Sequence, residues 1–475
     1  MFRYERGGFM RNTPVFDMLE RYRELGHISF AMPGHKGGRG FPAPFLEHIC
    51  AYDVTELAET DSLHAPREAI REAMRLAAAF YGAEETFFLV NGSTAGIHCM
   101  LAAACRRGGK VLVNRGCHMS LIHACILFGL EPVYIPQGLL EGFGVPAPVR
   151  PAQVQAALSR HRVQAVLLTS PNFYGVCADL EEIAAIAHAH RVPLLVDEAH
   201  GAHFAAADAL FPKTAIRAGA DMAVQSAHKT LNAPNQSAFL HIRSDLVDRE
   251  RLRAYTVMLQ TSSPSYPMVA AMDLARAELA GKNRWEETYH ACVALKRRIA
   301  RQSSIRPLTA EGAGGYAVDE TRLVFNFSAY QTTGFEVLWQ LAEREIDAEM
   351  ADLDNVVCIA TAANTAAELH TLEQALLSIA EKLPPAGNRY EAAPPPVLEQ
   401  AMPPADAFDA PGVYLPLKQA AGRISKTTAA AYPPGVPVIA CGERISPEAA
   451  AYLCELQEAG AEITGLRDEM IEVVK

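Results

Sequence analysis

The sequence predicts an α/β fold built on a mostly parallel sheet, and two patterns support this prediction. Short apolar runs rich in Val, Leu and Phe alternate with stretches of helical periodicity over the first part of the chain. These runs do not alternate between apolar and polar residues, which is typical of strands that helices cover on both faces. The candidate strands are Thr86–Val90, Val111–Asn114, Pro132–Ile135, Ala165–Thr169, Pro193–Asp197, Met222–Ser226 and Ala238–Ile242. In such a sheet the ligand site lies at the carboxyl ends of the strands.

Two of the intervening helices carry start and stop signals. Apolar residues recur at helical spacing over 66–82, where Pro66 can occupy the first helical position and Gly82 can end the helix. A second helix is predicted over Leu180–His190, because Asp179 followed by Glu182 forms a capping-box pattern.

The character of the chain changes after about residue 300. A strand is predicted at Leu323–Phe327, and helices are predicted at Glu336–Glu345 and Glu368–Lys382. A Pro-rich stretch from Leu383 to Gly412 then indicates a linker or an extended surface segment. We therefore expect an N-terminal arm over 1–50, a large domain over 51–300, a small α+β domain over 301–383, and the Pro-rich linker with a C-terminal domain over 384–475.

Composition excludes several classes of protein. The 475 residues are half hydrophobic and one-fifth charged, which provides ample core and excludes extensive disorder. The net charge of −11 argues against nucleic acid or an anionic membrane as a partner and suits a cationic substrate. No apolar run approaches the ~18 residues of a membrane helix, and the N-terminus has no signal-peptide core. The ten cysteines form no CxxC pair, so we expect reduced thiols in a cytoplasmic enzyme without a metal.

Three of the candidate strands are followed by residues that can do chemistry. Residues 91–96 (NGSTAG) precede an apolar helix, and backbone N–H groups at such a helix start can bind an anion. Asp197 ends another strand, where a buried carboxylate requires a cationic partner. Lys229 follows a third strand, where burial can make a lysine a nucleophilic amine.

Each signal has an ordinary alternative. The NGSTAG segment could be a capped turn, Lys229 could be solvated, and residues 197–203 contain an Asp, a Glu and two His that could bind a metal, although their spacing matches no trusted ligand pattern. Taken together and in this chain order, the three signals fit a pyridoxal phosphate site. The lysine would form the Schiff base, the aspartate would keep the pyridine nitrogen protonated, and the helix start would hold the phosphate.

With these residues placed, the sequence resembles the Orn/Lys/Arg decarboxylase family of fold type I pyridoxal-phosphate enzymes. The motifs are MPGHKGG at 32–38, NGST at 91–94, DEAHGAH at 197–203, SAHKTL at 226–231, QTSSPSYP at 260–267 and YPPGVP at 432–437. The resemblance implies a seven-stranded, mostly parallel sheet in a cofactor-binding large domain, with smaller α+β parts after it.

The resemblance also implies residue roles. Lys229 would carry the cofactor and Asp197 would face its pyridine nitrogen, with His200 close to the ring and His118 stacked on it. Around the phosphate it places Ser93, Thr94, Ser226 and His228. Thr261 and Ser262 would reach the site of a neighbouring subunit, because family sites form at a dimer interface. Residues 33–38 are read as part of the N-terminal arm near the site and not as a P-loop, since no Ser or Thr follows Gly-Lys and no strand precedes them.

Length suggests which branch of the family is involved. The PGHK motif lies so close to the start that no wing domain fits before it, so the sequence resembles the short biosynthetic form. We therefore expect a homodimer or a dimer of dimers that decarboxylates arginine, lysine or ornithine for polyamine biosynthesis, with a slight preference for arginine.

Several points stay open at this stage. The carboxylate that binds the distal cation of the substrate could be Asp53, Glu56, Asp61 or Glu443. The proton donor at the substrate Cα could be Lys229, Cys117 or a histidine. The alternatives to a decarboxylase are another fold type I enzyme (an aminotransferase, lyase or aldolase), a non-catalytic regulatory relative, and a metal-dependent hydrolase.

Overall fold

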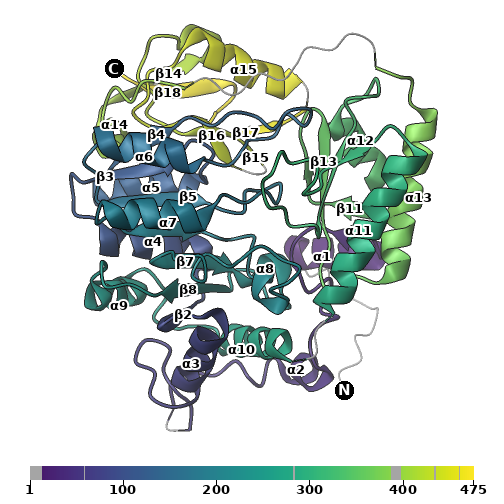
Figure 1. The fold of residues 1–475 in the computed structure, drawn as a ribbon, viewed down its shortest axis with the longest axis horizontal. Coiled ribbons are helices and arrows are strands. Elements are labelled where there is room, and N and C mark those ends of the chain that lie inside the picture. The colour runs from purple at the N-terminus through teal and green to yellow at the C-terminus, as the bar shows by residue number, and fades with distance from the viewer. Residues whose placement is uncertain (1–12, 58, 282–283, 387–396, 433–434, 459) are drawn as a thin grey trace.

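A computed structural model describes residues 13–57, 59–281, 284–386, 397–432, 435–458 and 460–475. Its centre is a seven-stranded sheet (Figure 1). In spatial order the strands are β2 (Glu85–Leu89), β8 (Ala238–Ile242), β7 (Met222–Ser226), β6 (Leu194–Asp197), β5 (Ala165–Thr169), β3 (Lys110–Asn114) and β4 (Glu131–Ile135). Neighbouring strands from β7 to β4 are parallel, and β8 is antiparallel to both of its neighbours. The predicted seven strands and their mostly parallel order are confirmed.

Successive residues of these strands face two different apolar cores. Val111 and Val113 belong to one buried cluster, and Leu112 between them belongs to another. Because both faces are covered, both need apolar side chains, which explains why the strand runs show no polar alternation. The covering helices are α3 (Ala69–Tyr81), α4 (Gly92–Ala104), α5 (Met119–Phe128), α6 (Pro151–Arg160), α7 (Leu180–Ala189), α9 (Arg249–Met258) and α10 (Tyr266–Ala280).

Helix α4 packs unusually close to the sheet. A Cβ atom on Gly96 would lie 2.4 Å from Cγ2 of Val224 on β7, so only glycine fits there. This contact holds the start of α4 against the strand that leads to Lys229.

The start of α3 differs from the prediction. The helix begins at Ala69, so Pro66 precedes it instead of occupying its first turn. The carboxylate of Asp61 reaches this end and accepts hydrogen bonds from the backbone N–H groups of Arg67, Glu68 and Ile70. A capping group eight residues before the helix is not visible in a local sequence pattern. Helix α7 begins after Asp179 as predicted and ends at Ala189, one residue before the predicted end; the Asp179 carboxylate accepts the N–H of Glu182.

A small domain follows the large one and appears in green at the right of Figure 1. Its antiparallel sheet has the order β12 (Met350–Ala351), β13 (Asn355–Ile359), β10 (Arg322–Asn326) and β9 (Arg306–Pro307). Its helices are α11 (Trp285–Gln302), α12 (Gly334–Ala342) and α13 (Ala366–Lys382). The helices α12 and α13 begin two residues before their predicted starts, because Thr333 and Thr365 form complete capping boxes. Helix α12 ends at Ala342 rather than at Glu345, which has a positive φ of 60°.

The N-terminal segment is attached to the small domain. It contains α1 (Pro14–Leu25), β1 (Ile28–Phe30) and α2 (Ala43–His48), and β1 pairs in parallel with β11 (Ile346–Ala348). The loop between β1 and α2 carries the PGHK motif back to the large domain. There the N–H of Gly34 donates to the carbonyl of His228 at 2.7 Å.

The last part of the chain forms two small sheets. Their strands are β14 (Gly412–Pro416), β15 (Ala429–Tyr432), β16 (Val436–Ile439), β17 (Glu462–Thr464) and β18 (Met470–Val474), with α14 (Pro404–Asp409) before them and α15 (Pro447–Glu458) between β16 and β17. Residues 387–396 of the predicted Pro-rich linker, and residues 433–434 of the YPPGVP motif, lie outside the described residues. Among the helices that the structure describes, none combines the length and apolar composition needed to span a bilayer.

A buried ion pair joins this last part to the large domain. The guanidinium of Arg115 donates to both carboxylate oxygens of Glu443, at 2.6 and 3.0 Å, and to the carbonyl of Val438 at 2.8 Å. Glu443 has no exposed surface, and the backbone N–H of Ala440 also donates to it. Because the pair is buried, removing either residue would leave the other charge without compensation. The contact between the two parts of the chain therefore depends on both residues.

Replacing Glu443 by Gln is therefore expected to lower the free energy of unfolding by about 3–5 kcal/mol, because the charge of Arg115 stays buried without its partner. Glu181→Gln is the matched control, since it breaks an exposed pair with Lys213, and it should cost at most about 1 kcal/mol. Urea unfolding measures both variants. Equal losses in the two variants would contradict the assigned role of the Arg115–Glu443 pair.

Candidate active site

The sheet brings the three predicted strand-end signals to one edge. Asp197 is the last residue of β6, and β7 beside it ends at Ser226 and leads into the short helix α8 (Ala227–Thr230), which carries Lys229. Ser93 lies in the first turn of α4, and its hydroxyl is 2.8 Å from that of Ser226. Residues from three separate strand ends thus meet in one place.

Lys229 is partly buried and has a histidine as its close neighbour. Its Nζ lies 2.9 Å from Nε2 of His200. Burial lowers the pKa of Lys229 to about 8, although the nearby carboxylate of Asp197 acts in the opposite direction. At pH 7 roughly a tenth of this amine is therefore uncharged, far more than for an ordinary lysine, and the uncharged form is a nucleophile.

Asp197 is a buried carboxylate with little compensation. It is 4% exposed, and the backbone N–H of Ala199, at 3.2 Å, is the one hydrogen-bond donor found for it among the described residues. Burial raises the pKa of Asp197, and Lys229 and the Ala199 N–H offset this in part. The charge of Lys229 lies near enough to act on Asp197, but the side-chain contact recorded for its Nζ is with His200. A cationic N–H group placed between them would satisfy the carboxylate, and the protonated ring nitrogen of pyridoxal phosphate is such a group.

The first turn of α4 fits a phosphate. Asn91 precedes the helix but makes no side-chain capping bond, so the N–H groups of Ser93 and Thr94 point out of the helix end. Two further hydroxyls belong to Thr230, at the end of α8, and to Ser237, directly before β8. Both are buried, and no hydrogen-bond partner is found for them among the described residues. His228 Nδ1 lies 3.0 Å from the carbonyl of Ser237, which leaves Nε2 available.

The remaining predicted residues fall into two groups. His118 is the N-cap of α5, where its Nδ1 accepts the N–H of Ser120, and burial lowers its pKa to about 4, so the ring is neutral. A neutral ring suits stacking on another aromatic ring. Thr261 and Ser262 are exposed and make no hydrogen bond to the Lys229 cluster in the described chain. Their predicted role in a neighbouring subunit's site stays a prediction.

Sequence reasoning did not identify Arg322. This arginine begins β10 in the small domain, and its Nη2 lies 2.9 Å from Nδ1 of His200. The available signal was a charged residue at the start of a largely apolar strand, because a charge buried at such a position needs a partner.

The four carboxylates considered for the substrate's distal cation have different surroundings. Glu443 is held by Arg115, and Asp61 caps α3. Asp53 and Glu56 are exposed, and Glu56 accepts the hydroxyl of Thr55. The structure therefore leaves no buried, free carboxylate among these four.

The side chains of the 197–203 segment face separate partners and do not form a metal centre. Glu198 accepts from Gln225 at 2.7 Å, and His203 pairs with Asp319 at 3.2 Å. Among the described residues no cluster of three or more potential metal ligands is present.

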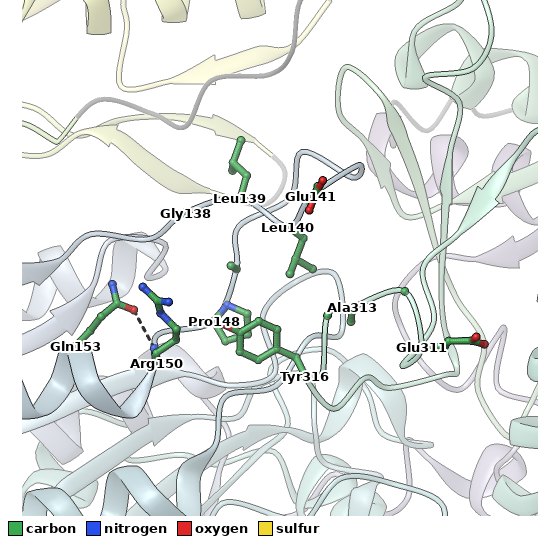
Figure 2. Close-up of a pocket in the computed structure, with 13 residues that line it drawn as sticks. Gly138, Leu139, Leu140, Glu141, Pro148, Arg150, Gln153, Glu311, Ala313 and Tyr316 are labelled. Carbon is green, nitrogen blue, oxygen red and sulfur yellow. Dashed lines mark hydrogen bonds between the residues drawn. The ribbon is translucent and has the colours of Figure 1, made fainter.

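A pocket of about 470 Å³ lies elsewhere, between the segment after β4 and residues 311–316 (Figure 2). Figure 2 shows Arg150 and Tyr316 at its wall, and none of the predicted site residues lines it. The chemistry is thus assigned to the strand ends and not to this pocket.

Comparison with known proteins identifies the family. Residues 13–336 match the major domain of the Orn/Lys/Arg decarboxylases, and residues 388–475 match their C-terminal domain. The chain belongs to the Orn/Lys/Arg decarboxylase family. An arginine decarboxylase of Bacillus subtilis is 33% identical over 98% of this decarboxylase-family chain and 97% of its own length. An arginine decarboxylase of Bacillus anthracis is also 33% identical, with the same coverage. The predicted class of enzyme, an amino-acid decarboxylase of the pyridoxal-phosphate type, is confirmed for this family member.

Solved structures confirm fold type I. The lysine decarboxylase of Francisella novicida superposes with a TM-score of 0.76 at 19% identity, covering 93% of this chain and 78% of that one. The constitutive lysine decarboxylase of Escherichia coli gives the same TM-score at 18% identity, with 97% and 82% covered. A chain described as SPT with PLP shares the fold of the decarboxylase family at a TM-score of 0.59, covering 74% of this chain and 87% of its own. At these identities the superpositions show the fold alone.

The environment of Asp197 predicts a pH effect on the cofactor-free protein. Asp→Asn at 197 should stabilise the fold, and the gain should grow as the pH rises above about 4. In that range the unfolded chain has lost the proton of this carboxyl while the folded chain, with its raised pKa, keeps it, so wild-type stability falls until the pH passes the folded pKa. Asn has no such titration.

Thermal unfolding of cofactor-free wild type and D197N between pH 4 and 8 measures the difference. Asp53→Asn at an exposed position is the control and should change little at any pH. A stability difference between wild type and D197N that does not vary with pH would contradict the burial argument.

Proposed function

We propose that this chain binds pyridoxal phosphate at the Lys229 cluster and removes the α-carboxylate of a basic L-amino acid, with arginine preferred. The observation that carries the proposal is the meeting of Lys229 and the poorly compensated Asp197 at neighbouring strand ends, beside the uncapped start of α4. The preference for arginine is supported by full-length relatives that are named arginine decarboxylases. The amine made from arginine is a precursor for polyamine biosynthesis, which is the proposed metabolic role.

The chain's own residues would hold the cofactor from four sides. Nζ of Lys229 would bind its aldehyde carbon, and Asp197 would accept the N–H of the ring nitrogen. The phosphate would lie against Ser93, Thr94, Ser226 and His228. His118 would cover one face of the ring, and His200 would remain beside Lys229. When bound, this group supplies an electron-accepting ring for the electron pair left by the departing CO2.

Proton positions in the site favour this use. A cation beside Asp197 would restore its ionised form, since opposite charge lowers a carboxyl pKa. Burial raises the pKa of Cys117 to about 12, so its Sγ retains its proton and is a poor acid for the substrate Cα. Lys229 and the histidines around it are the better candidates for that transfer.

We also propose that the active form is a homodimer or a dimer of dimers. Support comes from helix α1, where Val15, Phe16, Leu19 and Tyr22 are all more than half exposed, and apolar side chains gathered on one short helix are typical of a surface covered in an assembly. The cytoplasm is the proposed compartment, because none of the ten cysteines forms a disulfide. Light scattering tests the assembly, and a purely monomeric active protein would refute it.

The decisive experiment is product analysis with arginine, lysine and ornithine side by side, in the presence of pyridoxal phosphate. We expect CO2 and the corresponding amine, fastest with arginine, and no keto acid. Lys229→Ala should abolish steady-state turnover, because no amine remains to bind the cofactor or release the product.

Lys213→Ala, at an exposed position away from the site, is the control and should retain full activity. Substantial turnover by the Lys229→Ala variant, or keto acid as the main product, would overturn the proposed function.

A further inference from the structure

Arg322 is a fully buried cation that enters the site from the small domain. It is 1% exposed, and its guanidinium lies over the ring of Phe173 at 5.8 Å. Space for it is made by Gly175, where a Cβ atom would lie 2.7 Å from Cβ of Arg322. Gly175 also accepts the N–H of Asp319 at 2.8 Å, so the loop after β5 and the start of β10 are joined at this point.

The contact between Arg322 and His200 decides where the histidine carries its proton. A guanidinium has only donors, so Nδ1 of His200, 2.9 Å from Nη2 of Arg322, must accept. A histidine that accepts at Nδ1 is neutral and carries its hydrogen on Nε2. Phe173 packs edge-on against the same ring, with centroids 4.9 Å apart, and helps to hold its orientation.

The consequence reaches Lys229. Its Nζ lies 2.9 Å from the Nε2 of His200, which is now a donor. An ammonium group has three donors and no lone pair, so two donors would face each other if Lys229 were charged. The contact is a hydrogen bond only when Lys229 is a neutral amine that accepts through its lone pair.

We propose that Arg322 is a positioning residue that fixes His200 in the Nε2–H form and thereby increases the share of Lys229 present as the uncharged, nucleophilic amine. This inference rests on the proposed function in one respect, that Lys229 is the reactive amine.

The other groups around Lys229 do not provide the same effect. Asp197 on β6 and Glu349, which follows β11, both favour the charged form of the lysine, whereas Arg322 and burial oppose it. His118 and His228 are neutral, because burial lowers the pKa of each to about 4. Arg322 is therefore the one fixed charge near Lys229, among the described residues, that favours the free amine.

The first test measures the proton on His200 in unmodified, cofactor-free protein. Nitrogen NMR of protein labelled with 15N-histidine, with the His200 signals assigned by their loss in His200→Gln, should show a protonated Nε2 and an unprotonated Nδ1 at neutral pH. A signal from protonated Nδ1, alone or with protonated Nε2, would overturn the proposal without any change to Arg322.

The second test measures Lys229 directly by competitive acetylation with acetic anhydride over a pH series, with the Lys229 peptide quantified by mass spectrometry. In wild type the half-maximal reactivity should fall near pH 8. In Arg322→Met the pH of half-maximal reactivity should rise by at least one unit, which corresponds to a tenfold loss of free amine at pH 7. Arg322→Lys keeps the positive charge and can still donate a hydrogen bond, so its midpoint should fall between those of wild type and Arg322→Met. Arg75→Met, which removes an exposed arginine from α3, should match wild type.

The outcomes separate this inference from the proposed function. An unchanged midpoint in folded Arg322→Met or Arg322→Lys would refute the role of Arg322 even if arginine is decarboxylated normally. If the midpoint shifts as expected but product analysis finds no amine, the proposed function fails while the coupling of Arg322, His200 and Lys229 stands.

Discussion

Burial of opposite charges at adjacent strand ends is the constraint on which the site depends. Asp197 ends β6, and Lys229 follows the end of the neighbouring parallel strand β7 in a sheet covered on both faces, so neither can be fully hydrated. Burial pushes each group toward its neutral form, raising the pKa of the acid and lowering that of the amine. A carboxylate that lacks a cation and an amine that can lose its proton are the two groups that the proposed cofactor would engage.

The large domain alone does not complete this site. Gly34 of the N-terminal arm bonds to the backbone of His228, and Arg322 of the small domain bonds to the ring of His200. A Cβ on Gly34 would lie 2.6 Å from the carbonyl oxygen of Leu231, so the arm contacts the Lys229 segment as closely as backbone allows. A movement of the N-terminal arm or of the small domain relative to the sheet would therefore change the contacts around Lys229.

The fold is shared more widely than the chemistry. Lysine decarboxylases and a chain described as SPT with PLP superpose on this structure at less than 20% identity. Function must therefore be argued from the site and from the family to which the sequence belongs. Here both lead to the same conclusion, since the family match covers the segments that carry Ser93, Asp197 and Lys229.

The sequence by itself determined the seven strands, their mostly parallel order and the residues at their carboxyl ends, because apolar runs, glycines and capping residues act locally. Ser93, Asp197 and Lys229 could be placed together because parallel strands end at one edge of a sheet. Only the tertiary structure decided that Asp61 caps α3, that Glu443 is held by Arg115, and that Arg322 lies against His200. These pairs join residues from different parts of the fold, and no periodicity or local motif encodes which distant charge will meet which buried partner.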